Sequence, residues 1–289
     1  MTRVLVTGAS GFIGRHTIAP LLARGDEVHL IARTPVPGCT VHSLDLLTDD
    51  PASLLTRIAP SHLLHLAWYA EPGKFWHAPQ NVDWLAASLR LARAFATSGG
   101  DRLVTTGTCA EYDWSHPLLD EATTPLAPAT LYGTAKAALF TTLTAANLAR
   151  YAHARIFFPY GPGERSGRLL PDVIDAVRAN RRVATSDGAQ TRDFIHVTDA
   201  AAALVALLHS PATGAVNIAS GTAHPLRTII ETAAALAGNA CLIDWGARPR
   251  QPGEPDIMAA STHRLTSEIG FTPHFSLRSG LADMVASRA

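Results

Sequence analysis

The sequence predicts an α/β fold with a doubly wound parallel sheet and a smaller C-terminal domain. Over the first 160 residues, short apolar runs alternate with longer helical stretches, as expected for strands that helices cover on both faces. A glycine-rich turn directly follows the first apolar run. The alternation then becomes irregular, and segment 159–167 is rich in Pro and Gly, which indicates a crossover into a second unit.

The expected elements follow the apolar runs, and polar residues or glycine close each of them. The first strand is expected at 3–7, and the helix at 12–24 ends at Gly25. Further strands are expected at 28–32, 41–44, 63–66, 103–106, 154–158, 193–197 and 215–219. Further helices are expected at 51–58, 82–98, 131–151, 170–179, 198–209 and 225–237, before two short helices in the tail. This order predicts a larger domain from residues 1–165 and 191–222 and a smaller one from residues 166–190 and 223–289.

Composition narrows the class of protein. Hydrophobic residues make up 47% of the 289 residues and charged residues 17%, which is typical of a packed globular chain. The 24 basic and 24 acidic side chains cancel, so no general affinity for nucleic acid or for an anionic membrane is expected. No apolar run reaches the roughly 18 residues of a membrane helix. The three cysteines lack CxxC spacing, which favours a reducing cytoplasm, and the thirteen histidines lack metal-ligand spacing, so no metal site is expected.

Residues 7–14 (TGASGFIG) form the turn between the first strand and the first helix. Gly8, Gly11 and Gly14 suit a place where the turn is tight and the backbone approaches a pyrophosphate. Free amides at the start of the helix then hold the phosphates. The placement directly after the first strand predicts a Rossmann-type dinucleotide-binding domain.

The end of the second strand bears on the choice of dinucleotide. An NAD-binding fold usually carries an acidic residue about 20 residues beyond the glycines, where it binds the ribose 2′-hydroxyl. Here residues 32–34 are Ala, Arg and Thr. A guanidinium at Arg33 pairs with a 2′-phosphate, and Arg15 lies just past the third glycine to assist. The sequence therefore favours NADP (NADPH), with NAD as the alternative if Arg33 is an ordinary surface charge.

Tyr132 and Lys136 are four residues apart, so on a helix they share one face. A nearby ammonium lowers the pKa of a tyrosine from about 10 toward neutrality, and such a tyrosine can exchange a proton with a carbonyl or carbinol oxygen. Thr108 follows the strand at 103–106, where side chains face the ligand crevice of a parallel sheet. These three residues are the predicted catalytic group. The alternative is a surface lysine near a helix-start tyrosine.

Together the motifs resemble the extended short-chain dehydrogenase/reductases, and more narrowly the NAD(P)-dependent epimerase/dehydratase family that modifies nucleotide sugars. The likeness is carried by TGxxGxxG at 7–14, a strand-end threonine before YxxxK at 132–136, and RDFIHV at 192–197. HLA at 65–67 and YGPG at 160–163 extend it over essentially the whole chain.

The resemblance implies a set of functional residues. Thr108, Tyr132 and Lys136 would be the catalytic triad, with Asp45 and Leu46 at the adenine. The cofactor-binding residues would be Gly8, Gly11, Phe12, Ile13, Gly14, Arg15, Arg33, Asp45, Leu46, Leu66, Ala67, Thr106, Tyr132, Lys136 and Pro159. The substrate-binding residues would be Trp68, Tyr69, Thr108, Glu111, Arg192, Arg248 and Arg250, with Arg192 and either Arg248 or Arg250 at the sugar-nucleotide diphosphate. The smaller domain would bind the substrate.

The resemblance also implies a homodimer through the helices at 82–98 and 131–151. Both helices carry apolar stripes, namely Leu85, Leu89, Ala92 and Phe95 on the first and Leu139, Leu143 and Ala146 on the second. The alternative is that these stripes are buried within one chain.

Departures from the family pattern reduce the number of reactions that are expected. Nucleotide-sugar 4,6-dehydratases carry an Asp-Glu pair directly after the catalytic threonine, where this chain has Cys109 and Ala110, so dehydration is not expected. The asparagine that often precedes YGPG is also absent. The leading hypothesis is an NADPH-dependent reductase of a nucleotide-activated 4-keto-6-deoxyhexose. The alternatives are a nucleotide-sugar 4-epimerase with tightly bound NAD, a reductase of an unrelated carbonyl, and a non-catalytic dinucleotide sensor, against which YxxxK argues.

Overall fold

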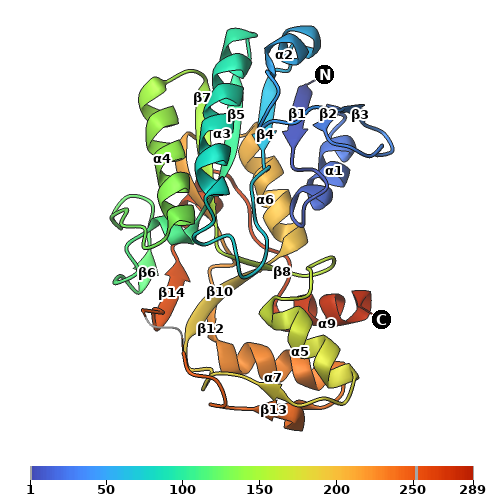
Figure 1. The fold of residues 1–289 in the computed structure, drawn as a ribbon, viewed down its shortest axis with the longest axis vertical. Coiled ribbons are helices and arrows are strands. Elements are labelled where there is room, and N and C mark those ends of the chain that lie inside the picture. Colours follow the sequence, from blue (N-terminus) through green and yellow to red (C-terminus); the bar gives the residue numbers. More distant parts are fainter. Residues whose placement is uncertain (1, 251–252, 289) are drawn as a thin grey trace.

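The computed structural model describes residues 2–250 and 253–288, and its largest element is a seven-stranded parallel sheet (Figure 1). The strand order is β11-β7-β5-β4-β1-β2-β3. The strands are β1 (Arg3–Thr7), β2 (Glu27–Ile31), β3 (Thr40–His42), β4 (His62–His65), β5 (Arg102–Thr108), β7 (Arg150–Ile156) and β11 (Gly214–Ile218). The chain runs outward in opposite directions from β1 and β4, so the carboxyl ends of these two strands border a crevice. The predicted doubly wound fold is confirmed.

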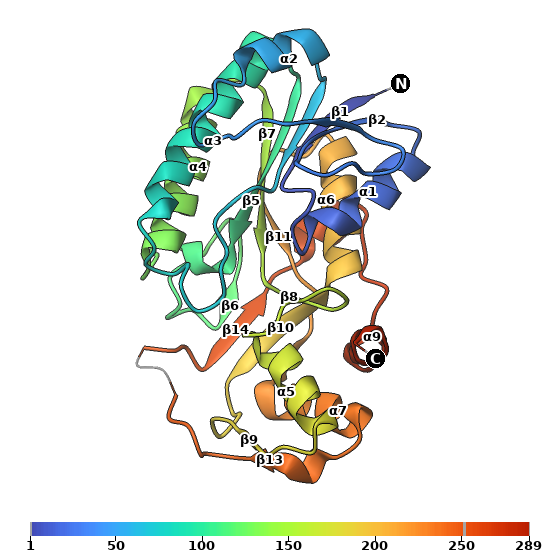
Figure 2. The ribbon, with the colours of Figure 1, turned by 45° about the vertical axis from the view of Figure 1, so that its right-hand side comes forward.

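Helices cover both faces of this sheet (Figures 1 and 2). One face carries α1 (Gly14–Ala23) and α6 (Val197–His209), and the other carries α2 (Ala52–Ile58), α3 (Gln80–Thr97) and α4 (Leu131–Ala146). Successive strand residues point to opposite faces, and β1 shows the result. Val4 and Val6 join the core under α1 and α6, whereas Leu5 joins the core under α2, α3 and α4.

A second, smaller sheet lies below the first. Its order is β12-β10-β14-β6, with β8 paired to β10. These strands are β6 (Leu118–Leu119), β8 (Phe158–Tyr160), β10 (Thr191–His196), β12 (Ala223–Pro225) and β14 (Ile257–Ala260). The remaining elements are α5 (Leu169–Arg178), β9 (Val183–Ala184), α7 (Leu226–Ala237), β13 (Ile243–Asp244), α8 (His263–Ser267) and α9 (Leu277–Ser287), with short 3₁₀ turns at Cys109–Glu111 and Ala240–Leu242. Helices α5, α7 and α9 share a separate apolar core.

Two expectations differ from the structure. The helix predicted at 131–151 ends at Ala146, because Asn147 adopts the left-handed conformation (φ 47°) that asparagine tolerates at a helix end. This lets β7 begin at Arg150, earlier than the predicted 154. Of residues 191–222, which were predicted in the larger domain, β11 joins the large sheet and α6 packs against it, but β10 lies in the smaller sheet. The chain therefore crosses between the sheets at His196.

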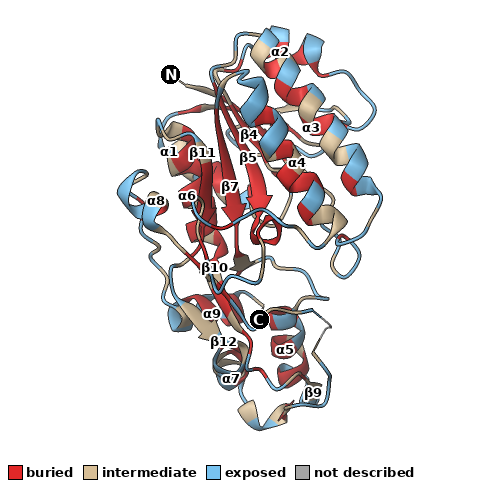
Figure 3. Ribbon diagram, turned by 90° about the vertical axis from the view of Figure 1, so that its left-hand side faces the viewer, coloured by how far each residue is buried: buried red, intermediate tan, exposed pale blue. Residues whose placement is uncertain are grey.

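The colouring by burial shows how the sheet is enclosed (Figure 3). Its strands are largely buried apart from the edge strand β3, while α2, α3 and α4 present exposed outer faces. Within the described ranges, no helix is long and apolar enough to cross a membrane. Across those same residues, no cluster of three or more His, Cys, Asp or Glu side chains is placed to hold a metal ion.

Candidate active site

The glycine turn packs directly against the end of β4. Gly8 has φ +73°, and a Cβ atom there would lie 2.6 Å from the Ala67 nitrogen. At Gly14 a Cβ atom would lie within overlap distance, 2.1 Å, of the Gly8 carbonyl oxygen. Helix α1 has no side-chain cap at its N-terminus, where the amides of Arg15 and His16 donate to the carbonyls of Gly11 (3.2 Å) and Ile13 (3.0 Å). This tight, uncapped turn fits a dinucleotide pyrophosphate.

Arg15 and Arg33 occupy different positions around this turn. The Arg15 guanidinium folds back onto it, donating to the carbonyls of Gly11 (3.2 Å) and Ser10 (3.4 Å). Arg33 follows β2 and is exposed. Phe12 and Ile13 are half-buried at the start of α1.

Two other predicted cofactor residues lie directly against the glycine turn. Leu66 and Ala67 are half-buried directly after β4, where their amides donate to the carbonyl and hydroxyl of Thr7. Thr106 lies on β5 and Pro159 on β8.

The predicted adenine contacts are held in a loop before α2. The Asp45 side chain accepts the Leu47 amide at 3.0 Å, so part of its hydrogen-bonding capacity serves the loop itself. Leu46 is buried in the core under α2, and its carbonyl accepts the Arg90 guanidinium at 3.1 Å.

The three predicted catalytic residues come together at the start of α4. The Thr130 hydroxyl caps this helix by accepting the Gly133 amide. A Cβ atom on Gly133 would lie 2.3 Å from the Ala110 carbonyl oxygen, so the glycine lets the helix approach the turn that follows Thr108. Burial raises the pKa of Tyr132, and the nearby Thr108 side chain opposes this shift by favouring the ionised form.

The pKa of Tyr132 is not lowered by Lys136, contrary to the prediction from the sequence. Burial, together with the negative charge of Glu111, raises the pKa of Tyr132 above its ordinary value, rather than lowering it toward neutrality. The ammonium of Lys136 does not bond the phenol but donates to the Thr106 carbonyl at 2.7 Å. Burial lowers the pKa of Lys136 to about 7, with Glu111 opposing the shift. Tyr132 is therefore a protonated phenol at neutral pH, ready to donate.

An aromatic segment between β4 and α3 covers the tyrosine. The ring of Phe75 meets Tyr132 edge-on at a centroid distance of 4.9 Å, and Trp76 does so at 5.9 Å. The Tyr132 amide donates to the Trp76 carbonyl at 3.0 Å. Phe75 was not singled out from the sequence, because its role depends on this contact with a residue far along the chain.

Trp68 and Tyr69 lie at the base of that segment. The Trp68 ring faces Lys136, and its indole nitrogen donates to Asn81 at 2.8 Å. The Tyr69 hydroxyl donates to Glu71 at 2.9 Å. Both were predicted to contact substrate, and that role stays a prediction.

Glu111 does not line the site, contrary to the prediction that it binds substrate. Its side chain is fully buried, with Oε1 accepting the Thr108 amide (2.8 Å) and a His153 ring proton (3.0 Å). Oε2 accepts the Arg155 guanidinium at 2.8 Å. Burial alone would raise the pKa of Glu111, but the hydrogen bond from His153 and the charge and hydrogen bond of Arg155 lower it to about 2. Glu111 is therefore a buried residue that holds the Thr108 backbone in place through its amide.

The partners of Glu111 extend this network into β7. Burial lowers the pKa of His153, so its ring is neutral at pH 7. Because Nε2 must donate to the carboxylate, Nδ1 is left to accept from Thr105, 2.7 Å away. Gly107 leaves the necessary space, since a Cβ there would lie 2.2 Å from His153 Nε2.

Two of the three arginines predicted at the diphosphate are already paired with carboxylates. Arg192 is buried, and its guanidinium donates to Glu254 at 2.9 Å. Arg250 bonds Asp187 (2.9 Å) and Asp256 (2.7 Å). Arg248 is exposed on the same loop. Their role at a diphosphate stays a prediction, and the carboxylates neutralise two of the three charges.

Arg168, which the sequence reasoning missed, acts on the site from the smaller domain. It precedes the first turn of α5, and its guanidinium lies 5.3 Å from the Phe75 ring centroid. Its charge favours the ionised form of Tyr132. The only sequence signal was a basic residue ahead of the apolar start of α5.

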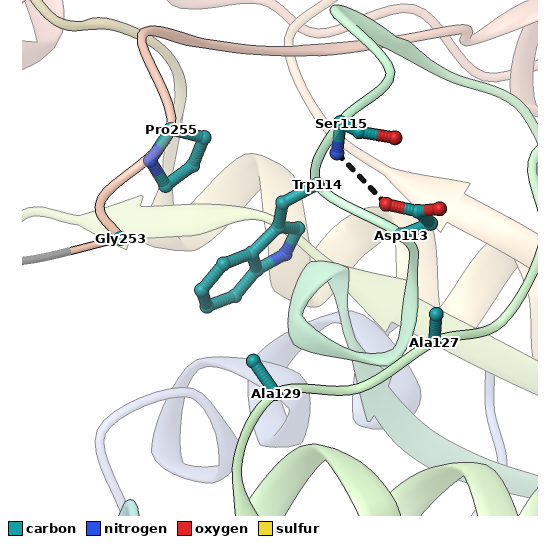
Figure 4. Close-up of a pocket in the computed structure, with 7 residues that line it drawn as sticks. All are labelled: Asp113, Trp114, Ser115, Ala127, Ala129, Gly253 and Pro255. Atoms are coloured by element: carbon teal, nitrogen blue, oxygen red, sulfur yellow. Dashed lines mark hydrogen bonds between the residues drawn. The ribbon is translucent and has the colours of Figure 1, made fainter.

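A hollow of about 330 Å³ opens beside the turn that follows Thr108 (Figure 4). Trp114 borders it and donates from its indole nitrogen to the Cys109 carbonyl at 3.0 Å, which fixes the hollow next to Thr108. The lining residues come from the loop before α4 and from the tail; they are Asp113, Trp114, Ser115, Ala127, Ala129, Gly253 and Pro255.

Comparison with known proteins gives the family. The model of the NAD dependent epimerase/dehydratase family matches residues 4–219. The chain belongs to this family. The predicted resemblance and the prediction of an enzyme are both confirmed.

Individual relatives show what this family member is similar to. A UDP-glucose 4-epimerase of Corynebacterium glutamicum is 26% identical over 97% of this chain and 94% of its own length. The dTDP-6-deoxy-L-talose 4-dehydrogenase (NAD(P)(+)) of Kitasatospora kifunensis is 29% identical over 98% of this chain and 94% of its own. The crystal structure of a UDP-glucose 4-epimerase from Thermus thermophilus in complex with NAD superposes with a TM-score of 0.85 at 25% identity, covering 99% and 98% of the two chains. The chain is thus an enzyme of a family whose relatives modify nucleotide sugars.

Replacing Glu111 by alanine should destabilise the fold, because Arg155 would be left buried without its counter-ion. Breaking a buried pair costs about 3–5 kcal/mol, measured as the free energy of unfolding in urea. Glu231→Ala, which breaks an exposed ion pair with Arg227, is the control and should change little. The native stability from Glu111 should be complete above about pH 4.5 and fall as the pH drops toward 2. A Glu111→Ala variant as stable as the wild type would contradict this account.

Proposed function

We propose that the enzyme reduces a nucleotide-activated 4-keto-6-deoxyhexose with NADPH. The observation that carries the proposal is the chemistry around Thr108. Tyr132 and Lys136 lie beside it, but the two next residues are Cys109 and Ala110, both buried. Burial raises the pKa of the Cys109 thiol to about 12, so it stays neutral. The site therefore offers a proton donor without the acidic pair that sugar dehydration needs.

The side chains divide the work of carbonyl reduction. When bound, nicotinamide supplies the hydride that the keto carbon accepts. Tyr132 donates its phenolic proton to the keto oxygen, and its raised pKa keeps that proton in place at neutral pH. Thr108 polarises the same oxygen by a hydrogen bond. Lys136 contributes its ammonium beside the phenol and favours the phenolate left after proton transfer.

A nucleotide-sugar 4-epimerase with tightly bound NAD is the second candidate. It is favoured by the several relatives named UDP-glucose 4-epimerase. The same three residues would serve, but the sugar would be oxidised and then reduced with no net consumption of cofactor. The dehydrogenase of Kitasatospora kifunensis, in contrast, is named for net redox chemistry on a 6-deoxy sugar. Supplying 4-keto-6-deoxy sugar nucleotides with NADPH, and separately supplying UDP-hexoses without it, separates the two functions.

Substitutions in the catalytic group test the proposed chemistry. Tyr132→Phe keeps the ring but removes the proton, so turnover should fall by about two to four decades while cofactor binding survives. Lys136→Ala should reduce both turnover and cofactor binding, and Thr108→Ala should have a smaller effect because it removes a polarising hydrogen bond only. NADPH consumption with a 4-keto-6-deoxy sugar nucleotide is the assay. Unchanged turnover in Tyr132→Phe would remove the catalytic assignment.

We also propose that NADPH is preferred over NADH, because Arg33 stands exposed at the end of β2 where an NAD site carries a carboxylate. Arg33→Asp should weaken NADPH binding by about one to two decades, the contribution of a charge-assisted phosphate contact. Arg181→Asp makes the same charge change at an exposed residue beyond α5 and is the control. Titration calorimetry measures the affinity of each protein for NADPH and for NADH. Tighter binding of NADH than of NADPH by the wild type would refute the preference.

A homodimer through α3 and α4 is the proposed assembly. Ala92, Phe95, Leu139 and Leu143 are buried within the chain, so the interface would use the outer faces, where Val82 is 56% exposed. Val82→Arg should place a charge in that interface and give monomers in light scattering. Leu118→Arg, at a leucine 55% exposed on β6, should leave the dimer intact. A monomeric wild type at micromolar concentration would contradict the proposal.

A further inference from the structure

Trp68 makes a contact that the proposed mechanism does not use. The Lys136 nitrogen lies 3.8 Å from the centroid of the Trp68 ring. An ammonium at this distance over the face of an indole is attracted by the negative face of the ring. Lys136 is only 3% exposed, so this contact lies in the interior of the protein.

A buried amide holds the indole in this orientation. The Trp68 nitrogen donates to the Asn81 side-chain oxygen at 2.8 Å. The Asn81 amide group in turn donates to the carbonyls of Phe75 (2.7 Å) and Ala78 (2.9 Å), and Asn81 is fully buried. The indole is thus fixed between the end of β4 and the first turn of α3, with its face toward α4.

The ammonium has few other partners. It donates to the Thr106 carbonyl at 2.7 Å, and its distance to the Tyr132 ring centroid is 5.9 Å. Among the ion pairs of residues 2–250 and 253–288, none includes Lys136. A buried charge without a carboxylate partner needs another source of stabilisation.

The titratable groups around Lys136 come from four elements. Glu111, in the turn after β5, favours the ammonium. His65 on β4 and His153 on β7 would oppose it if protonated, but burial lowers the pKa of both, so neither is charged at neutral pH. Tyr132, on the same helix, is a neutral phenol. Glu111 is therefore the charged neighbour, and Trp68 supplies the contact.

We propose that Trp68 is a positioning residue, whose indole face holds the side chain of Lys136 as a charged ammonium beside Tyr132. The inference rests on the proposed roles of Tyr132 and Lys136 in catalysis. Because burial brings the pKa of Lys136 to about 7, a modest loss of stabilisation changes the charged fraction of this lysine at neutral pH. Trp68 thereby sets the pH range in which the tyrosine has a charged neighbour.

The sequence makes a direct measurement practical, because Lys74 and Lys136 are its only two lysines. Lys74 is exposed and paired with Glu71. In a Lys74→Arg background, protein labelled with ¹³C and ¹⁵N in lysine gives signals from Lys136 alone. Titration of these signals reports the pKa of Lys136 without any substrate. The ε-methylene protons should also shift upfield, because the face of an aromatic ring shields nearby protons.

Two substitutions of Trp68 distinguish the effect of its aromatic face from the effect of its side-chain volume. Trp68→Leu removes the aromatic face, so the Lys136 midpoint should fall by about one pH unit, the size of a desolvated cation–π contact. The upfield shift should disappear, and the pH range of turnover should move down in parallel. Trp68→Phe keeps an aromatic face and should restore most of both effects. Circular dichroism checks that each variant is folded.

Three results would overturn the proposal. The first is an unshifted ε-methylene signal in the wild type, which needs no variant at all. The second is a Lys136 midpoint in Trp68→Leu that stays constant or rises. The third is loss of the upfield shift when NADPH saturates the wild type, because the ring would then not face Lys136 in the loaded enzyme. Since these readouts require no turnover, they stay informative even if 4-keto sugar nucleotides are not reduced.

Discussion

The buried carboxylate of Glu111 is the interaction on which the catalytic end of the sheet depends. One oxygen accepts the Thr108 amide and the other accepts the Arg155 guanidinium, so β5 and β7 are joined where β5 ends. In a low-dielectric interior such a pair is costly to break. The same negative charge favours the ammonium of Lys136 and disfavours the phenolate of Tyr132. The Glu111 side chain thus holds the Thr108 backbone in place. It also favours the protonated forms of Tyr132 and Lys136.

Close backbone approach assembles the rest of the site. Gly8 and Gly14 let the glycine turn lie against the end of β4, Gly107 leaves space for the Glu111–His153 contact, and Gly133 lets α4 reach the turn that follows Thr108. A Cβ atom at any of the four would lie less than 3 Å from a neighbouring atom. The close approach of these segments therefore depends on the absence of a side chain at the four glycines.

The fold and the proximity of Thr108, Tyr132 and Lys136 could be predicted because their signals are local. Apolar runs define strands, and YxxxK places two residues on one helical turn. The contact of Glu111 with the Thr108 amide is a local capping box, but its pairing with His153 and Arg155 could not be predicted because they are more than 40 positions away. Arg192 and Arg250 look alike as free cations in sequence, yet folding pairs both with distant carboxylates. The ionisation of Tyr132 and Lys136 likewise depends on burial, which spacing does not reveal.

The central claim is that the assembled trio carries out a net reduction. The most direct measurement follows deuterium from NADPH labelled at the transferable position of the nicotinamide into a 4-keto-6-deoxy sugar nucleotide, by mass spectrometry and NMR of the sugar. The account predicts one deuterium on carbon 4 of each product sugar, matched by one NADP formed. Sugar products that interconvert without label and without NADP formation would contradict it and establish the epimerase instead.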